Sequence, residues 1–322
     1  MMEEEKRERK TTRRDFLRIS GAAALAASVT GFIPALKGKA GKEGNIFSGI
    51  SYAGERPDYE IYALKYASAD YFPGYVLHWM GRPPFVPNQP PLFAHFYYWL
   101  IKGHGMNILF DSGVTAATAK AHRLLNYEDH STVLGKLGLK TGDIDAVVTS
   151  HAHWDHVNGI GQFPNARHYI QEACYRWTVE KAPKYPMLRK IGYPANQDID
   201  LVVKCHMKGN LVLVPGKKDS KGEEILPGID AIRVDGHYVG LQSLNVKTAK
   251  GPVVLASDAS YAYSNYEEDW PVGIIHGEMT DALDGMQRFR KILGRNGTFV
   301  PGHDTEVLKK FPEIMPGVAK IA

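Results

Sequence analysis

The sequence predicts an α/β fold in which two β-sheets pack against each other and helices cover their outer faces. Short strand-like runs recur along the chain, and most are bounded by Gly, Pro, Asn or Asp. They come in groups that helix-like stretches separate in both halves of the chain. The chain has 322 residues, of which 44% are hydrophobic and 23% charged, so it can bury a large core.

The individual elements follow from apolar periodicity. Strands are expected over 60–67, 95–102, 107–110, 146–149, 168–170, 211–214, 231–234, 243–248, 253–256 and 298–300. Helices are expected over 115–126, 131–138, 172–182, 280–294 and 304–311. In the helix over 280–294, Thr280 is the expected N-cap. One apolar face of this helix is formed by Leu283, Met286, Phe289, Ile292 and Leu293. The Lys-rich segment 215–222 reads as a surface loop rather than a domain boundary.

The charge distribution argues against a nucleic-acid-binding protein. The net charge of +4 lies entirely in residues 1–40, and residues 41–322 are neutral. A nucleic-acid-binding domain needs a basic face on its folded part. The two cysteines, Cys174 and Cys205, are too far apart for a CxxC element, so they read as ordinary thiols, with a single disulfide as the alternative.

The first forty residues resemble an export signal. Arg13–Arg14 followed by Phe16–Leu17 is similar to the twin-arginine signal of bacteria, and a weakly apolar Ala/Gly-rich run follows. That run contains Ser, Thr, Gly and Pro, so no permanent membrane span is expected, although a retained N-terminal anchor is the alternative. We therefore expect a signal peptide over 1–40, a single folded domain over 41–322, and a periplasmic or extracellular location.

A dense cluster of metal-ligand side chains follows the strand expected over 146–149. Residues 150–159 read Ser-His-Ala-His-Trp-Asp-His-Val-Asn-Gly. In an extended segment His151 and His153 point the same way, and Asp155 and His156 face a second position. One metal ion needs three or four protein ligands, so two pairs indicate two metal ions if further ligands arrive from elsewhere.

Three later positions could supply those ligands. His237, Asp258 and His303 each lie on a loop that directly follows an expected strand. A rigid strand end can aim a side chain from such a loop toward a common site. Each position alone is a weak signal, but together and in this order they form a strong one.

The series His151-x-His153-x-Asp155-His156, His237, Asp258 and His303 resembles the dinuclear metallo-β-lactamase superfamily, over roughly residues 60–310. This resemblance implies an αββα four-layer sandwich. Asp111-Ser-Gly113 is similar to the family's early Asp-Thr-Gly turn, with Ser in place of Thr. Asp258-Ala-Ser-Tyr261 and Gly302-His-Asp304 look most like the N-acyl homoserine lactonases, whereas zinc β-lactamases generally lack the bridging Asp.

The resemblance also implies roles for these residues. One metal ion would be held by His151, His153 and His237, the other by Asp155, His156 and His303, and Asp258 would bridge them. The implied cofactors are two divalent metal ions, expected to be Zn²⁺, whose shared water becomes hydroxide near neutral pH. Tyr261 would donate a hydrogen bond to the substrate oxygen, and Asp155 would carry the proton to the leaving oxygen. Asp111 would either orient a ligand from behind or cap its own turn.

An aromatic stretch of the sequence could form one wall of a substrate pocket. Residues 71–110 contain no Asp or Glu, and the part before residue 93 is too rich in proline for a central strand. It is either a cover over the core or the wall of an apolar pocket. In the pocket interpretation, the tail of a small lactone or ester substrate contacts Phe72, Tyr75, Trp79, Met80 and Phe85.

The expected function is hydrolysis of lactones, with N-acyl homoserine lactones as the first choice. Other carboxylic esters, thioesters and phosphotriesters are the alternatives, because hydroxide attacks any polarised electrophile. A mononuclear-iron oxygenase of the same fold and a non-catalytic binding protein are the other classes. A glyoxalase-like thioesterase would carry a C-terminal helical domain, which is not expected in the nineteen residues after His303. Nucleic-acid partners are not expected, and the oligomeric state is left open, with a homodimer as one option.

Overall fold

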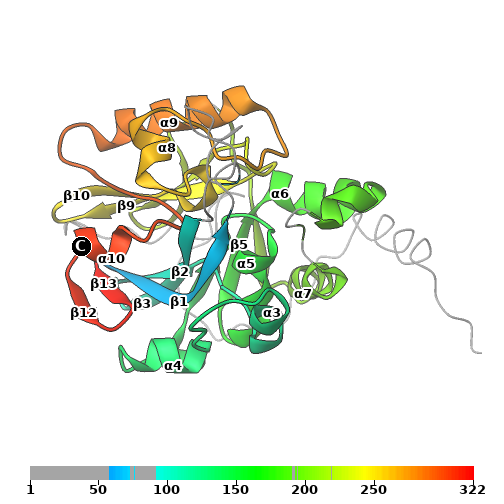
Figure 1. Cartoon of the computed structure of the whole chain (residues 1–322), viewed down its shortest axis with the longest axis horizontal. Helices are drawn as coiled ribbons and strands as arrows, with labels where there is room; N and C mark the ends of the chain where they lie inside the picture. The colour runs from blue at the N-terminus through cyan, green and yellow to red at the C-terminus, as the bar shows by residue number, and fades with distance from the viewer. Residues whose placement is uncertain (1–57, 73–75, 77–91, 191–192, 194, 219) are drawn as a thin grey trace, which may run out of the picture. The chain divides into compact units, whose positions relative to one another are not determined.

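The computed structural model describes residues 58–72, 76, 92–190, 193, 195–218 and 220–322, and these residues form two β-sheets with flanking helices (Figure 1). The eight-stranded sheet has the order β12-β13-β1-β2-β3-β4-β5-β6. Its strands are β1 (Glu60–Phe72), β2 (Leu92–Gly103), β3 (Met106–Phe110), β4 (Ala146–Val148), β5 (Arg167–Gln171), β6 (Leu211–Val214), β12 (Glu313–Met315) and β13 (Val318–Lys320). The five-stranded sheet has the order β11-β10-β9-β8-β7. Its strands are β7 (Glu223–Leu226), β8 (Ile229–Arg233), β9 (Gln242–Thr248), β10 (Gly251–Leu255) and β11 (Thr298–Val300).

Helices cover the outer faces of both sheets, as the sequence predicted. Figure 1 shows α8 (Tyr263–Glu267) and α9 (Met279–Leu293) on the side of β9 and β10, where α9 packs on β10. On the other side, α4 (His130–Gly135) packs on β1 and α7 (Asn196–Met207) packs on β6. Shorter helices are α3 (Ala116–Ala121), α5 (Trp154–Val157), α6 (Glu172–Arg176) and α10 (Val307–Lys310). The described residues 215–218 and 220–222 lie between β6 of the first sheet and β7 of the second and form no strand or helix.

Strand alternation explains why β2 is apolar on both faces. Tyr97, Trp99 and Ile101 lie in the core between the two sheets, whereas Tyr98 and Leu100 pack under α3 and α4. Successive side chains of a strand point to opposite faces, so a strand covered on both sides needs a continuous apolar run. The run from Phe96 to Ile101 satisfies this requirement.

Several expected boundaries were wrong. The helix expected over 115–126 ends at Ala121, because Arg123 and Asn126 have positive φ angles and Leu125 pairs with Ser68 of β1. The helix over 172–182 becomes a π-helical turn after Arg176. The helix over 304–311 shortens to Val307–Lys310. The elements not expected from the sequence are α5, α7, α8, β7, β12 and β13.

The cap and the buried face of α9 also differ from expectation. Glu278 is the N-cap and Thr280 lies inside the first turn. The buried positions are Ala282, Gly285, Met286, Phe289 and Leu293, while Leu283 and Ile292 are half-buried. The face is rotated because Gly285 approaches Val234 so closely that a Cβ there would lie 2.3 Å from Val234 Cγ1.

Some expectations fall on residues outside the described ranges. These are the signal peptide over 1–40 and the wall residues Tyr75, Trp79, Met80 and Phe85; Phe72 ends β1, but its side chain is not described. Both Cys174 and Cys205 are free thiols, and Cys174 is fully buried in α6. Within the part of the chain that is described, no helix combines the length and apolarity that a membrane crossing needs.

One glycine fixes how the loop after β8 packs on α6. Gly240 has φ +75°, and a Cβ at this position would lie 2.3 Å from the backbone nitrogen of Cys174. Gly240→Ala should therefore lower the free energy of unfolding by about 2–4 kcal/mol, from left-handed strain plus overpacking. Gly138 is the matched control, since it has φ +72° with no atom within 4 Å, and Gly138→Ala should show only the strain of about 1 kcal/mol. Urea unfolding measures both losses, and equal losses would contradict the close approach at Gly240.

Candidate metal centre

The carboxyl ends of several strands bring the candidate ligands to one edge of the two sheets. His151, His153, Asp155 and His156 follow β4, His237 follows β8, Asp258 follows β10 and His303 follows β11. β3, β4, β5 and β6 are parallel, and so are β10 and β11, so the loops after them gather at one edge. All seven side chains expected from the sequence lie together there and are buried.

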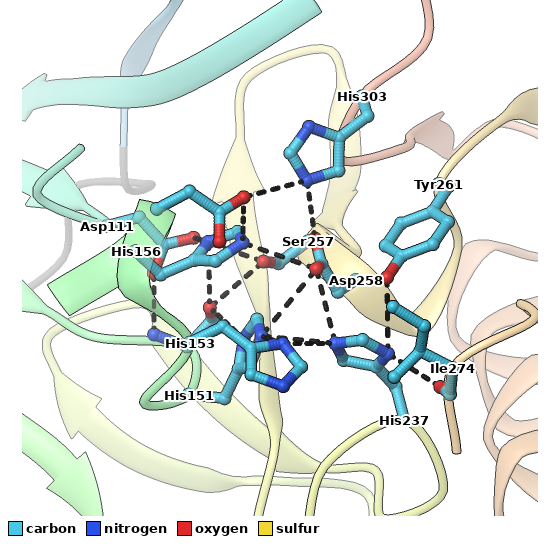
Figure 2. Close-up of polar contacts among 12 residues, drawn as sticks. Asp111, His151, His153, His156, His237, Ser257, Asp258, Tyr261, Ile274 and His303 are labelled. Atoms are coloured by element: carbon cyan, nitrogen blue, oxygen red, sulfur yellow. Dashed lines mark hydrogen bonds and ion pairs between the residues drawn. The ribbon is translucent and has the colours of Figure 1, made fainter. Parts of the chain in front are cut away.

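These side chains form two groups that share Asp258. One group contains His151, His153, His237 and Asp258, and the other contains Asp155, His156, His303 and Asp258. Asp258 Oδ2 lies 3.3 Å from His237 Nε2 and 3.3 Å from His156 Nε2, whereas Oδ1 lies 3.0 Å from His303 Nε2 (Figure 2). The carboxylate therefore stands between the two groups, as a bridging ligand must.

The ring nitrogens of the first group face one another. His153 Nδ1 lies 3.0 Å from His151 Nε2 and 2.9 Å from His237 Nε2, and the latter two nitrogens are 3.2 Å apart. Two nitrogen ligands of one tetrahedral Zn²⁺ lie about 3.3 Å apart, given Zn–N distances of about 2.0–2.1 Å. The spacing of these three nitrogens fits a shared cation.

The second group also fits a cation. His156 Nε2 and Asp258 Oδ1 are buried side-chain atoms without a hydrogen-bond partner, although each lies near oppositely charged groups. Buried polar atoms are rarely left unpaired, because the loss of their hydration is costly. A divalent cation coordinated by these atoms would remove that cost.

The pKa values of His156 and Asp258 shift because the carboxylates and imidazoles of the second group lie close together. Burial lowers the pKa of His156, but Asp155, Asp258 and Asp111 outweigh it and raise this pKa well above its ordinary value. Burial raises the pKa of Asp258, but the imidazoles of His156 and His303 hold it well below its ordinary range. Burial lowers the pKa of His151 and His153 well below the usual value, so both rings are neutral at pH 7 and can offer a lone pair.

Asp111 forms hydrogen bonds that link the two candidate groups, on the side of the ligands that faces away from the shared site. Its Oδ2 accepts hydrogen bonds from His156 Nδ1 at 2.8 Å and from Ser257 Oγ at 3.0 Å, and its Oδ1 accepts one from Ser150 N at 2.7 Å (Figure 2). Ser150 Oγ contacts His151 Nδ1 at 2.9 Å and Ser257 Oγ at 2.9 Å. Asp111 therefore links a ligand of each group. It orients a ligand, as one of the two sequence interpretations predicted, from a turn with φ +67°.

Backbone carbonyls hold two further ligands. His237 Nδ1 donates to Ile274 O at 2.8 Å, and His303 Nδ1 donates to His95 O at 2.9 Å. A carbonyl can only accept, so the hydrogen of each ring lies on Nδ1 and the Nε2 lone pair points into the site. Both rings are thus fixed in the tautomer that a metal ligand needs.

Tyr261 lies beside both groups. Its hydroxyl is 3.4 Å from His237 Nδ1, and its ring is edge-on to His237 and His303, with centroids 5.4 and 5.3 Å away (Figure 2). Burial, together with the charge of Asp258, raises the pKa of this phenol well above its ordinary value. The hydroxyl therefore keeps its proton at neutral pH and can donate a hydrogen bond.

Sequence reasoning missed one residue at this site. His276 Nε2 lies 3.2 Å from His153 Nε2, and its ring also packs beside Tyr238. His276 stands alone between Ile275 and Gly277, with no spacing that relates it to the other histidines. Only the fold of the loop after α8 brings it here.

Comparisons with known proteins agree with this geometry. The sequence model of the family described as the metallo-beta-lactamase superfamily matches residues 97–303. The chain therefore belongs to the metallo-β-lactamase superfamily, and the predicted αββα sandwich is confirmed.

Curated relatives are N-acyl homoserine lactonases. The protein of that name from Bacillus cereus is 30% identical over 188 residues, which is 56% of this chain and 66% of the relative. One from Rhizobium radiobacter is 31% identical over 183 residues, which is 55% of this chain and 65% of the relative. The matches thus span slightly less than two thirds of these relatives.

Solved structures show the same fold. An N-acyl homoserine lactone hydrolase with N-hexanoyl-L-homoserine bound at its catalytic metal centre has a TM-score of 0.63 and 20% identity, covering 81% of this chain and 99% of that chain. A dizinc quorum-quenching lactonase has a TM-score of 0.58 and 16% identity, covering 83% and 95%.

The shared carboxylate yields a direct test of the two groups. Asp258→Asn should lower the metal content below two ions per chain, because a neutral amide bridges two cations far less well than a carboxylate. Elemental analysis after dialysis against buffered Zn²⁺ measures the content. Asp198→Asn is the control, since Asp198 is an equally buried carboxylate outside both groups, bonded to Asn158. Two ions in both variants would exclude Asp258 as a bridge.

Proposed function

We propose that this protein is a dinuclear metal-dependent hydrolase that opens the ring of N-acyl homoserine lactones. The observation that carries the proposal is the pair of ligand groups joined by Asp258, with the Tyr261 hydroxyl beside them. The names of the relatives support the choice of substrate. The imidazole and carboxylate donors suit Zn²⁺, and one structural neighbour is described as dizinc.

The seven candidate ligands divide into a set for each of two cations, with one carboxylate shared. His151, His153 and His237 would hold one cation, Asp155, His156 and His303 the other, and Asp258 both. The chemistry that two bound divalent cations supply is a hydroxide nucleophile at neutral pH and a polarised ester carbonyl. The residues of the chain orient the substrate and move the protons.

Tyr261 acts on the carbonyl oxygen of the substrate, and Asp155 acts on the oxygen that leaves. The Tyr261 hydroxyl donates a hydrogen bond to the carbonyl oxygen as negative charge develops there. After hydroxide has added to the carbonyl carbon, the Asp155 carboxylate accepts the proton of that hydroxyl group and passes it to the ring oxygen as the ester C–O bond breaks. Its neighbours His156 and His303 outweigh burial and lower the pKa of Asp155, so it begins as the base. The product is the ring-opened hydroxy acid.

A substrate panel tests this function. Purified protein should show a higher kcat/KM on N-acyl homoserine lactones than on aliphatic lactones, thioesters or phosphotriesters, and chelation should abolish every activity. Metal analysis of the same sample should give two zinc-like ions per chain. A phosphotriester preference would move the function to that class, and one iron per chain would indicate an oxygenase.

The hydroxyl of Tyr261 can be tested separately. Tyr261→Phe keeps the ring and removes the donor, so kcat/KM should fall roughly ten- to a hundredfold, equivalent to about 1–3 kcal/mol, with unchanged metal content. Tyr263→Phe is the matched control, because the Tyr263 hydroxyl is buried two residues further on without a hydrogen-bond partner. Wild-type kinetics for Tyr261→Phe on every lactone would show that the hydroxyl does not contact the substrate, and Tyr261 would then contribute only packing.

A further inference from the structure

His153 is oriented differently from the other candidate ligands. His151, His156, His237 and His303 present Nε2 to the site and use Nδ1 to contact Ser150, Asp111, Ile274 and His95. His153 instead presents Nδ1, which leaves its Nε2 on the outer side. The imidazole of His276 faces this outer nitrogen, and the two Nε2 atoms are 3.2 Å apart.

The positions of the hydrogens follow from this arrangement. A neutral imidazole that offers the lone pair of Nδ1 to a cation carries its hydrogen on Nε2. His153 Nε2 is therefore the donor, and His276 Nε2 must accept with its own hydrogen on Nδ1. Without this acceptor, His153 can move its hydrogen to Nδ1, where it would point at His151 Nε2 and His237 Nε2 and block the site.

A single loop supports two ligands of the first group. Within residues 272–277, Ile274 O accepts from His237 Nδ1 and His276 contacts His153 (Figure 2 shows Ile274). The backbone of the loop is tied down as well, since His276 N donates to the carbonyls of Gly236 and His237. The backbone of His276 is therefore fixed by the same turn that carries His237.

We propose that His276 is a positioning residue, which accepts a hydrogen bond from His153 and thereby holds His153 Nδ1 available to the first metal ion. This inference rests on the proposed dinuclear site and extends it to a residue outside the seven ligands. Partners behind a ligating histidine typically contribute 10- to 100-fold to metal affinity. His276 should therefore affect the group of His151, His153 and His237 and leave the other group unchanged.

The experiment measures metal affinity without reference to catalysis. Metal-free protein is titrated with Zn²⁺ against a chromophoric chelator, in wild type and in a His303→Ala background that leaves the first group complete. His276→Leu should weaken the first site about 10- to 100-fold. His276→Gln, whose side-chain oxygen can accept the same hydrogen bond, should restore the affinity to within about threefold of wild type.

Two controls separate positioning from loss of structure. Ile275→Ala perturbs a partly buried neighbour in the same loop without removing the imidazole, and it should leave the affinity unchanged. Thermal unfolding of each metal-free variant reports any general destabilisation. Equal weakening by His276→Leu, His276→Gln and Ile275→Ala would reduce His276 to packing and overturn the proposal.

The outcomes also distinguish this inference from the proposed function. Wild-type protein that binds fewer than two ions would refute the dinuclear site itself. Wild-type protein that binds two ions, with undiminished first-site affinity in His276→Leu, would refute only the role of His276.

Discussion

The site depends on one electrostatic constraint, which is the burial of Asp155 and Asp258 within reach of the same imidazoles. Neither carboxylate is more than 7% exposed, and both have His156 and His303 as neighbours. An ionised carboxylate in such a place is costly unless positive charge compensates it. The two carboxylates raise the pKa of His156 and of His303, so these imidazoles can carry the compensating charge in the metal-free protein, and bound cations would take over that role.

The candidate ligands are also oriented by contacts with their outer nitrogen atoms. Each of the five histidines has its outer nitrogen next to a fixed partner: a serine hydroxyl, a carboxylate, two backbone carbonyls and the His276 ring. The carboxylate and the two carbonyls can only accept, so they place a hydrogen on Nδ1 of His156, His237 and His303 before any cation arrives. Asp111 joins the two groups through Ser150 and His156, so the support behind one group is continuous with that behind the other.

The fold makes this possible by ending its strands at one edge. β4, β8, β10 and β11 come from both sheets, and the loops after them meet where the sheets face each other. Close packing fixes the loops: Gly240 lies against Cys174, and a Cβ on Gly302 would come within 3.0 Å of Asp258 Oδ1. The core between the sheets thus sets the geometry of the ligands.

The sequence by itself determined the layered α/β class, the strands β1 to β6 and β8 to β11, and the seven candidate ligand positions. These are carried by local signals: apolar alternation, strand-end residues and the spacing of His151, His153, Asp155 and His156. The tertiary structure decided what local signals do not encode. It showed that Thr280 is not the N-cap of α9, that Asp111 contacts one group directly and the other through a serine, and that His276 faces His153, from which it is separated by 123 positions in the sequence. Such contacts arise from packing between distant segments, and a single sequence contains no periodicity that reports them.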